Sequence, residues 1–256
     1  MTAAQPGSEH LPISVCMLTL NEADRLQQSL PPLDAFSELI IFDSGSQDRT
    51  LELCQAVGAT IHTVAWEGFG TTRRKLFEQA QCSWVLWLDA DEVITPELLD
   101  ELRQLFAKGP DKAAYAINRM VHFEGKWIAH GDWFPDWNVR LFRSDVWAMA
   151  DVAVHESLTI CGEVGQLQGL LKHYTYRDWR DQRQRSERYA RLWAEQKKAQ
   201  GKQVKFAEKY GRAAWRFCKG YLLKRGFLDG SIGLRIALAN AREVFMKYEL
   251  LDSAKK

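Results

Sequence analysis

An alternation of apolar runs and helix-forming segments in the first 110 residues most constrains the fold of this chain. Four short apolar runs, at 13–20, 38–42, 59–66 and 84–88, are each followed by a turn and a segment of helical composition. Repeats of this kind are typical of parallel βαβ units, because each helix returns the chain to the same edge of the sheet. We therefore predict a doubly wound α/β sheet.

The fourth predicted helix has the clearest limits. Thr95 suits an N-cap, Pro96 suits the first helical position, and Gly109 suits a helix stop. From 113 to about 171 the pattern changes to that of antiparallel strands, and from Asp178 the chain reads as helical and basic. We expect a flexible N-terminus (1–11), an α/β domain (12–175) and a basic amphipathic helical region (176–256).

Charge is distributed unevenly along the chain. Residues 1–171 contain 12 Lys and Arg against 24 Asp and Glu, whereas residues 172–256 contain 22 against 9, and the net charge is only +1. A basic end favours an anionic partner. Basic residues recur at helical spacing from Lys205, with aromatic residues from Phe206. This predicts either an ordinary packed helix or an interfacial helix on anionic lipid. No motif indicates nucleic-acid binding.

Targeting and cysteine signals favour a cytoplasmic protein. The five cysteines are widely spaced and form no C-x-x-C pair, which favours a reducing compartment over a disulfide framework. The N-terminus lacks the basic and apolar regions of a signal peptide, and no apolar run approaches the ~18 residues of a membrane span. We expect any contact with a membrane to be peripheral.

Three carboxylates follow directly on the fourth apolar run, at Asp89, Asp91 and Glu92. An Asp-x-Asp motif (DXD) at the carboxyl end of a strand suits a hard cation such as Mg²⁺ or Mn²⁺. An acidic helix start is the competing interpretation. The segments "LNEAD" and "FDSGSQD" also fall at strand ends, where ligands of such sheets bind. We predict that the three segments converge on one site.

In their order and spacing, "TLNEADRL", "IIFDSGSQDRT" and "WVLWLDADE" resemble the family-2 glycosyltransferases of the GT-A fold. The later "DWFPDWNVRLFRSD" and "VHE" are similar to one branch, the lipopolysaccharide core β-1,4-glucosyltransferases of Gram-negative bacteria. The similarity extends from about residue 12 to 250. It implies a Rossmann-like mixed sheet with a nucleotide-binding half at 12–110 and an acceptor half at 111–175.

The resemblance also implies an activity. The enzyme would be a metal-dependent, inverting hexosyltransferase that uses Mg²⁺ or Mn²⁺ and a nucleotide-sugar donor, with glucose from UDP-glucose as the expected sugar. The acceptor would be the heptose inner core of lipopolysaccharide, at the cytoplasmic face of the inner membrane, with peripheral contact to its anionic surface. Two alternatives stay open: a transferase for a polyprenyl phosphate or another cell-envelope glycan, and an inert glycolipid- or membrane-binding protein on this fold.

The resemblance assigns donor and metal residues. The residues implied to hold the nucleotide sugar are Thr19, Asn21, Glu22, Asp43, Ser44, Ser46, Arg73, Arg74 and Asp89. The implied metal ligands are Asp89, Asp91 and His173, while Glu92 is expected to be a helix-start carboxylate. The alternatives are a capping turn, which fits Asp48 better than Asp43, solvated surface charge for Arg73 and Arg74, and a core or surface position for His173.

An inverting transfer also needs a base that takes the proton of the acceptor hydroxyl. We favour Glu156, with Asp136 and Asp132 as the other candidates. His155 precedes Glu156, and on a strand the two would point to opposite faces. The rings of Trp127, Trp133 and Trp137 suit stacking on the acceptor sugar, and core packing is the competing interpretation.

Overall fold

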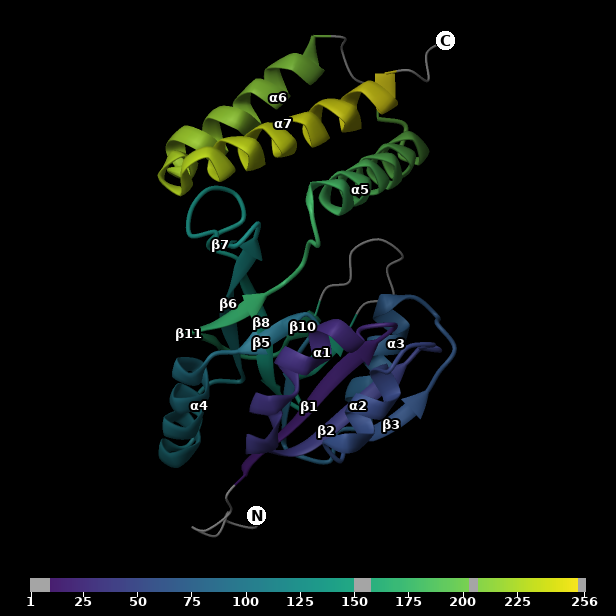
Figure 1. Cartoon of the computed structure of the whole chain (residues 1–256), viewed down its shortest axis with the longest axis vertical. Coiled ribbons are helices and arrows are strands. Elements are labelled where there is room, and N and C mark those ends of the chain that lie inside the picture. Colours follow the sequence, from purple (N-terminus) through teal and green to yellow (C-terminus); the bar gives the residue numbers. More distant parts are fainter. Residues whose placement is uncertain (1–9, 150–157, 203–206, 253–256) are drawn as a thin grey trace. The chain divides into compact units, whose positions relative to one another are not determined.

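The computed structural model describes residues 10–149, 158–202 and 207–252. The described chain divides into two compact units (Figure 1). The first unit contains the residues up to Arg119 together with Trp137–His173, and the second contains Met120–Asp136 together with the residues from Tyr174 onward. The segment 120–136, which the sequence prediction placed in the acceptor half, therefore groups with the C-terminal helices.

A parallel sheet forms the centre of the first unit. Its strands, in the spatial order β3-β2-β1-β4, are β1 (Leu11–Thr19), β2 (Phe36–Asp43), β3 (Thr60–Thr63) and β4 (Trp84–Trp87). The helices that connect and follow them are α1 (Ala23–Ser29), η1 (Pro31–Ala35), α2 (Thr50–Ala56), α3 (Phe69–Phe77) and α4 (Pro96–Lys108). The four predicted strand–helix units are confirmed.

The limits of α4 follow the predicted signals. Thr95 is the N-cap and its hydroxyl accepts a hydrogen bond from the Leu98 amide at 3.2 Å, while Pro96 is the first helical residue. Gly109 ends the helix at φ +84°, a backbone conformation that residues with a Cβ rarely adopt.

Antiparallel strands extend the sheet beyond β4. They are, in spatial order, β8 (Trp137–Arg143), β6 (Ala114–Phe123), β11 (Val164–His173) and β5 (Glu92–Ile94). Strand β8 runs antiparallel to both β4 and β6, and β11 runs antiparallel to β5. A separate two-stranded ribbon contains β9 (Trp147–Met149) and β10 (Leu158–Ile160). The predicted mixed α/β sheet is confirmed.

Both faces of the sheet are covered, which explains why the parallel strands β1, β2 and β4 are mostly apolar. Along β1, Val15 and Met17 pack into a core that also contains Leu98 of α4. Between them, Cys16 points to the other face, into a second core that contains Phe77 of α3. The polar segments that follow β1, β2 and β4 lie at the strand ends, where the candidate site is found.

The second unit is mainly helical. Its helical elements are α5 (Trp179–Ala199), α6 (Glu208–Cys218), η2 (Lys219–Leu223), η3 (Gly226–Asp229) and α7 (Gly230–Asp252). Helix α6 packs along α7 (Figure 1), and Ile232 and Ile236 of α7 form a core with Phe123 of β6. The short strand β7 (Lys126–Trp127) pairs with the end of β6. None of the helices described here is both long and apolar enough to cross a membrane.

Candidate functional site

The three acidic segments of the sequence meet at the carboxyl ends of β1, β2 and β4. Thr19, the last residue of β1, is in register with Asp43, the last residue of β2. Beyond these ends, the Asn21 amide donates to the Ser46 hydroxyl at 2.8 Å. On the other side of β1, the Leu88 amide donates to the Cys16 carbonyl at 3.1 Å. The structure thus brings together the segments that were predicted to converge.

Asp43 holds the turn that follows β2. One carboxylate oxygen accepts hydrogen bonds from the Gly45 and Ser46 amides, at 2.9 and 2.8 Å. The other accepts from the hydroxyls of Ser46 and Thr19, at 2.5 and 2.9 Å. Burial opposes ionisation, but these hydrogen bonds outweigh it and lower the pKa of Asp43. All four acceptor positions of the carboxylate are therefore used inside the turn, so its contact with a nucleotide stays a prediction.

Hydrogen bonds to neighbouring segments position the other residues near the predicted nucleotide-sugar site. Asp48 accepts from the amides of Ala23 and Thr50, at 3.2 and 3.0 Å, as expected for a capping residue. The Glu22 amide donates to the Thr50 hydroxyl at 2.8 Å, and the Ser44 amide donates to the Thr19 carbonyl at 3.1 Å. The predicted residues at the ends of β1 and β2 therefore lie together, and we call them the polar rim: Thr19, Asn21, Glu22, Asp43, Ser44 and Ser46.

Two arginines and a tryptophan surround Asp89. Its Oδ1 lies 3.2 Å from Nη2 of Arg73 and accepts from Nε1 of Trp87 at 3.2 Å, while Oδ2 lies 2.9 Å from Nη2 of Arg140. Both guanidinium groups lie 4.5 Å from the centre of the Trp87 ring. Burial opposes ionisation, but Arg140 and Arg73 outweigh it and hold the pKa of Asp89 far below its usual range. The carboxylate is still 26% exposed, so a ligand can reach it.

The prediction for Glu92 is wrong. Glu92 lies in strand β5 and is completely buried, whereas α4 begins only at Pro96. Its carboxylate is paired with Arg140 and with Arg119, the latter at 3.1 Å, and it accepts from the Asp89 amide at 3.0 Å. Its short strand is paired with β11, so the backbone carries Glu92 into the sheet before the helix can start.

Sequence reasoning missed Arg119 and Arg140. They are 27 and 48 residues from Glu92 along the chain. The available signal was an arginine inside an otherwise apolar strand, since Arg140 is buried between Val139 and Leu141 of β8. A buried arginine requires carboxylate partners, because removing an unpaired charge from water carries a large free-energy penalty.

Asp91 is mostly buried and faces His173. Its Oδ1 lies 3.5 Å from Nε2 of His173, the last residue of β11, and its Oδ2 lies 3.9 Å from Nη1 of Arg25. Burial opposes ionisation of Asp91, but the hydrogen bond and the charge of His173 prevail and lower its pKa. The sequence prediction that groups Asp91 with His173 thus corresponds to a close pair of side chains.

The Asp91 carboxylate suits Mg²⁺ or Mn²⁺ when phosphate and water oxygens complete the shell, whereas an imidazole nitrogen is a more general ligand of transition metals. Within the described ranges, no group of three or more His, Cys, Asp or Glu side chains could hold a metal. Nδ1 of His173 is buried and has no hydrogen-bond partner among the described residues. Asp91 and His173 fit two positions of such a shell, whereas the oxygens of Asp89 face Arg73 and Arg140. The metal role of all three residues stays a prediction.

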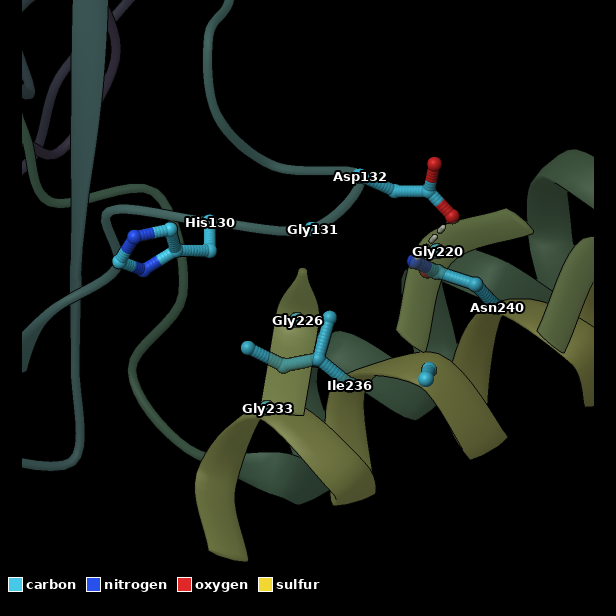
Figure 2. A pocket seen from close by; sticks show the side chains of 9 residues that line it. His130, Gly131, Asp132, Gly220, Gly226, Gly233, Ile236 and Asn240 are labelled. Carbon is cyan, nitrogen blue, oxygen red and sulfur yellow. Dashed lines mark hydrogen bonds between the residues drawn. The ribbon is translucent and has the colours of Figure 1, made fainter. Parts of the chain in front are cut away.

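The three candidates for the catalytic base differ in burial and in whether the structure describes them. Glu156 and His155 lie outside the described residues. Asp136 is half-buried. Asp132 is enclosed, with its side chain 1% exposed, 3.1 Å from Nε of Arg216 and 3.4 Å from Nζ of Lys224. Figure 2 shows Asp132 beside Gly220 and Asn240, within the second unit. Which carboxylate acts as the base stays a prediction.

The three predicted sugar-binding tryptophans have different surroundings. Trp133 packs against Phe123 and Tyr176 in the core of the second unit, as the competing interpretation proposed. Trp127 contacts Tyr174 edge-on and lies half-buried. Trp137 begins β8 and is exposed. A ring that stacks on a sugar needs an open face, so Trp137 and Trp127 keep this predicted role better than Trp133.

Known proteins resemble this chain over most of its length. The family model described as Glycosyl transferase family 2 matches residues 14–161. The lipopolysaccharide core biosynthesis glycosyltransferase LpsC of Rhizobium meliloti is 26% identical over 255 residues, 94% of either chain. An uncharacterized glycosyltransferase of Rickettsia typhi is 25% identical over 86% of this chain and 80% of its own. A crystal structure of S. aureus TarS 1–349 with UDP-GlcNAc gives a TM-score of 0.48 at 15% identity, over 95% of this chain and 91% of that one.

Proposed function

Because this chain belongs to glycosyl transferase family 2, we propose that it transfers a hexose from a UDP-sugar, glucose in our expectation, to the heptose inner core of lipopolysaccharide. The observation that carries the proposal is the convergence of three strand ends on Asp89 and Asp91, with His173 facing Asp91. The relative named for lipopolysaccharide core biosynthesis aligns with 94% of the chain, and this supports the acceptor class.

The polar rim would bind the nucleoside part of the donor. Exposed Asn21 and half-buried Ser44 lie at the ends of β1 and β2, and parallel strand ends are where such sheets bind nucleotides. Arg73 and Arg140 hold Asp89 ionised and oriented, so that its partly exposed oxygens can accept hydrogen bonds from ribose hydroxyls. The direct contacts to the base and ribose remain predictions for each of these residues.

Asp91 and His173 would hold Mg²⁺ or Mn²⁺, and the bound ion would offset the negative charge that builds on the departing diphosphate. Arg25, 3.9 Å from Asp91, is also bonded to Glu22 at 2.8 Å and so fixes the carboxylate relative to α1. An orientation fixed in advance lowers the reorganisation that the reaction would otherwise require.

In the transfer, the acceptor hydroxyl oxygen would form a bond to the anomeric carbon while the bond from that carbon to the diphosphate oxygen breaks. UDP leaves with the bonding electrons, and a carboxylate takes the hydroxyl proton. Glu156 is our first candidate for this carboxylate and Asp136 the second. Asp132 is enclosed between two cations, so we assign it a structural role in the second unit instead.

The acceptor class also suggests where the enzyme works. An inner core that is still attached to its lipid is held in a bilayer, so we place the reaction at the cytoplasmic face of the inner membrane. This placement follows from the proposed acceptor.

The experiment is a transfer assay with the full chain, a panel of UDP-sugars and a deacylated, heptose-terminated core oligosaccharide. We expect UDP release and a product one hexose heavier, with UDP-glucose as the preferred donor and with loss of turnover after metal chelation. Absence of UDP release from every donor with Mn²⁺ present would contradict the enzyme proposal. Release that requires a polyprenyl phosphate, and not heptose, would move the acceptor to another class.

A further inference from the structure

The turn between α6 and α7 exposes large apolar side chains. In η2, Leu222 and Leu223 are 53% and 67% exposed, and in η3, Phe227 and Leu228 are 45% and 54% exposed. Single exposed leucines are ordinary on protein surfaces, but four large apolar residues within seven positions form a concentrated surface that marks an interaction. We call residues 219–229 the apolar turn.

The apolar turn is held firmly within the second unit. The Gly131 amide donates to the Lys224 carbonyl at 3.0 Å, and the Asp229 carboxylate accepts from the His130 amide at 2.9 Å. Figure 2 shows this junction, where Gly226 and Gly233 lie against each other. A surface presented on a fixed support loses little conformational entropy when it binds, which favours association.

Cations flank the exposed side chains of the apolar turn. Lys219 precedes the two leucines, Lys224 and Arg225 follow them, and Asp229 is the single acidic residue of the segment. Arg225 is exposed and has a left-handed backbone at φ +56°, a conformation in which glycine would be less strained. Apolar side chains beside basic ones are typical of elements that lie in the surface of an anionic bilayer.

The basic residues of α6 are used differently from the predicted lipid-binding stripe. Lys209 is buried, 3.7 Å from Glu249, and Arg212 is bonded to Glu208 at 2.6 Å. Arg216 is paired with Asp132, while Lys205 lies outside the described residues. Lys209, Arg212 and Arg216 thus have carboxylate partners within the second unit, which leaves less of their charge for a lipid surface than the sequence predicted.

We propose that the apolar turn inserts into the interfacial layer of an anionic phospholipid bilayer. Its four exposed apolar side chains would enter the boundary of the acyl chains, and Lys219 and Arg225 would lie at the lipid phosphates, while Lys224 stays paired with Asp132. A second copy of the chain fits this surface less well, because a two-fold contact through the turn would bring like charges together.

The inference deepens the proposed function by naming the surface that brings the enzyme to a lipid-held acceptor. Vesicle binding needs neither donor nor acceptor, so its failure and the failure of the proposed transfer are separate results. A soluble core oligosaccharide measures transfer without the membrane.

The test compares the full chain with Leu222→Ser/Leu223→Ser in co-sedimentation with vesicles of phosphatidylethanolamine and phosphatidylglycerol. Removing two exposed leucines should lower vesicle partitioning roughly 10- to 100-fold, given the transfer free energy of their apolar area. The matched control is Val57→Ser/Leu192→Ser, which removes two exposed apolar side chains elsewhere and should leave partitioning unchanged. Transfer to the soluble oligosaccharide should be retained in both variants.

Three outcomes would overturn the inference. The first is equal vesicle partitioning of Leu222→Ser/Leu223→Ser and the unchanged chain. The second is binding that high salt abolishes completely while the leucine substitutions leave it intact, since adsorption would then be electrostatic alone. The third is no vesicle binding together with a dimer that Leu222→Ser/Leu223→Ser dissociates in sedimentation equilibrium, since the turn would then join two copies.

Discussion

Two aspartates, Asp89 in the first unit and Asp132 in the second, each contact two basic side chains but have different access to solvent. The side chain of Asp89 is 26% exposed, whereas that of Asp132 is 1% exposed. A Cβ on Gly220 would lie 2.6 Å from Oδ2 of Asp132, so backbone closes directly over this carboxylate. Contact with two cations is therefore common to a candidate ligand site and to a buried structural contact. The exposure of the carboxylate to solvent distinguishes the two.

The cations that face these two aspartates also differ in their exposure to solvent. Arg140 is 2% exposed and is paired with both Asp89 and Glu92, so two carboxylates share one guanidinium. Arg216 and Lys224, which face Asp132, are themselves more than a third exposed. Losing Arg140 should therefore be costly, because it leaves the completely buried Glu92 with one ion-pair partner fewer.

Arg140→Met should produce the largest loss of stability. It leaves Glu92 buried with Arg119 as its remaining ion-pair partner in the described chain, and a buried charge that loses its partner costs about 3–5 kcal/mol of unfolding free energy. Chemical denaturation measures this loss. The matched control is Arg143→Met, an exposed pair with Asp145, which should cost at most about 1 kcal/mol. Equal losses in the two variants would refute the contrast.

Asp91→Asn should lower sugar transfer about 10²- to 10³-fold, the usual effect of removing one group that stabilises charge in the transition state. It should also weaken the thermal stabilisation that Mn²⁺ gives in the presence of UDP. Asp132→Asn should show the opposite pattern, with a lower melting temperature and less than about a tenfold loss of transfer. Comparable turnover losses would place Asp132 in the catalytic site.

Gly233→Ala should lower the free energy of unfolding by about 1–3 kcal/mol, because the added methyl group would overpack the contact between Gly233 and Gly226 in the second unit. Its new Cβ would lie 1.9 Å from the Gly226 carbonyl oxygen, and that oxygen is part of the backbone and cannot rotate away. Gly211→Ala is the matched control within α6, where nothing lies within 4 Å, and it should stabilise by about 0.4–1 kcal/mol. Thermal unfolding compares the two variants. An unchanged melting temperature for Gly233→Ala would show that Gly233 and Gly226 are not closely packed.

Lowering the pH should reduce the free energy of unfolding through protonation of Asp89. Because its pKa is lower in the folded chain than in the unfolded one, its contribution is present above the unfolded pKa of about 3.9 and is lost as pH falls toward the folded pKa. Denaturation between about pH 5 and 2 should therefore show a steeper fall for the unchanged chain than for Asp89→Asn. Parallel curves would mean that Asp89 is not held ionised by Arg140 and Arg73.

The resemblance found in the sequence is confirmed at the level of the family by the match over residues 14–161. Much of the fold was also predictable, because strand periodicity and helix caps are local signals. The Thr95–Pro96–Gly109 pattern places α4 within its observed limits. The meeting of Asp43 with Thr19 follows from parallel strands, whose carboxyl ends share one edge of the sheet.

The sequence by itself determined the strand–helix order, the caps of α4 and the edge at which Asp89 and Asp91 emerge. Only the tertiary structure decided what faces these carboxylates. Arg140 is 51 residues from Asp89, and its apolar neighbours in the strand indicate that it needs a carboxylate partner but not which one. Strand order fixes such an encounter, and no local pattern records it. The burial of Glu92 between two arginines and the closing of glycine backbone over Asp132 arise in the same way, from segments that approach only when the chain folds.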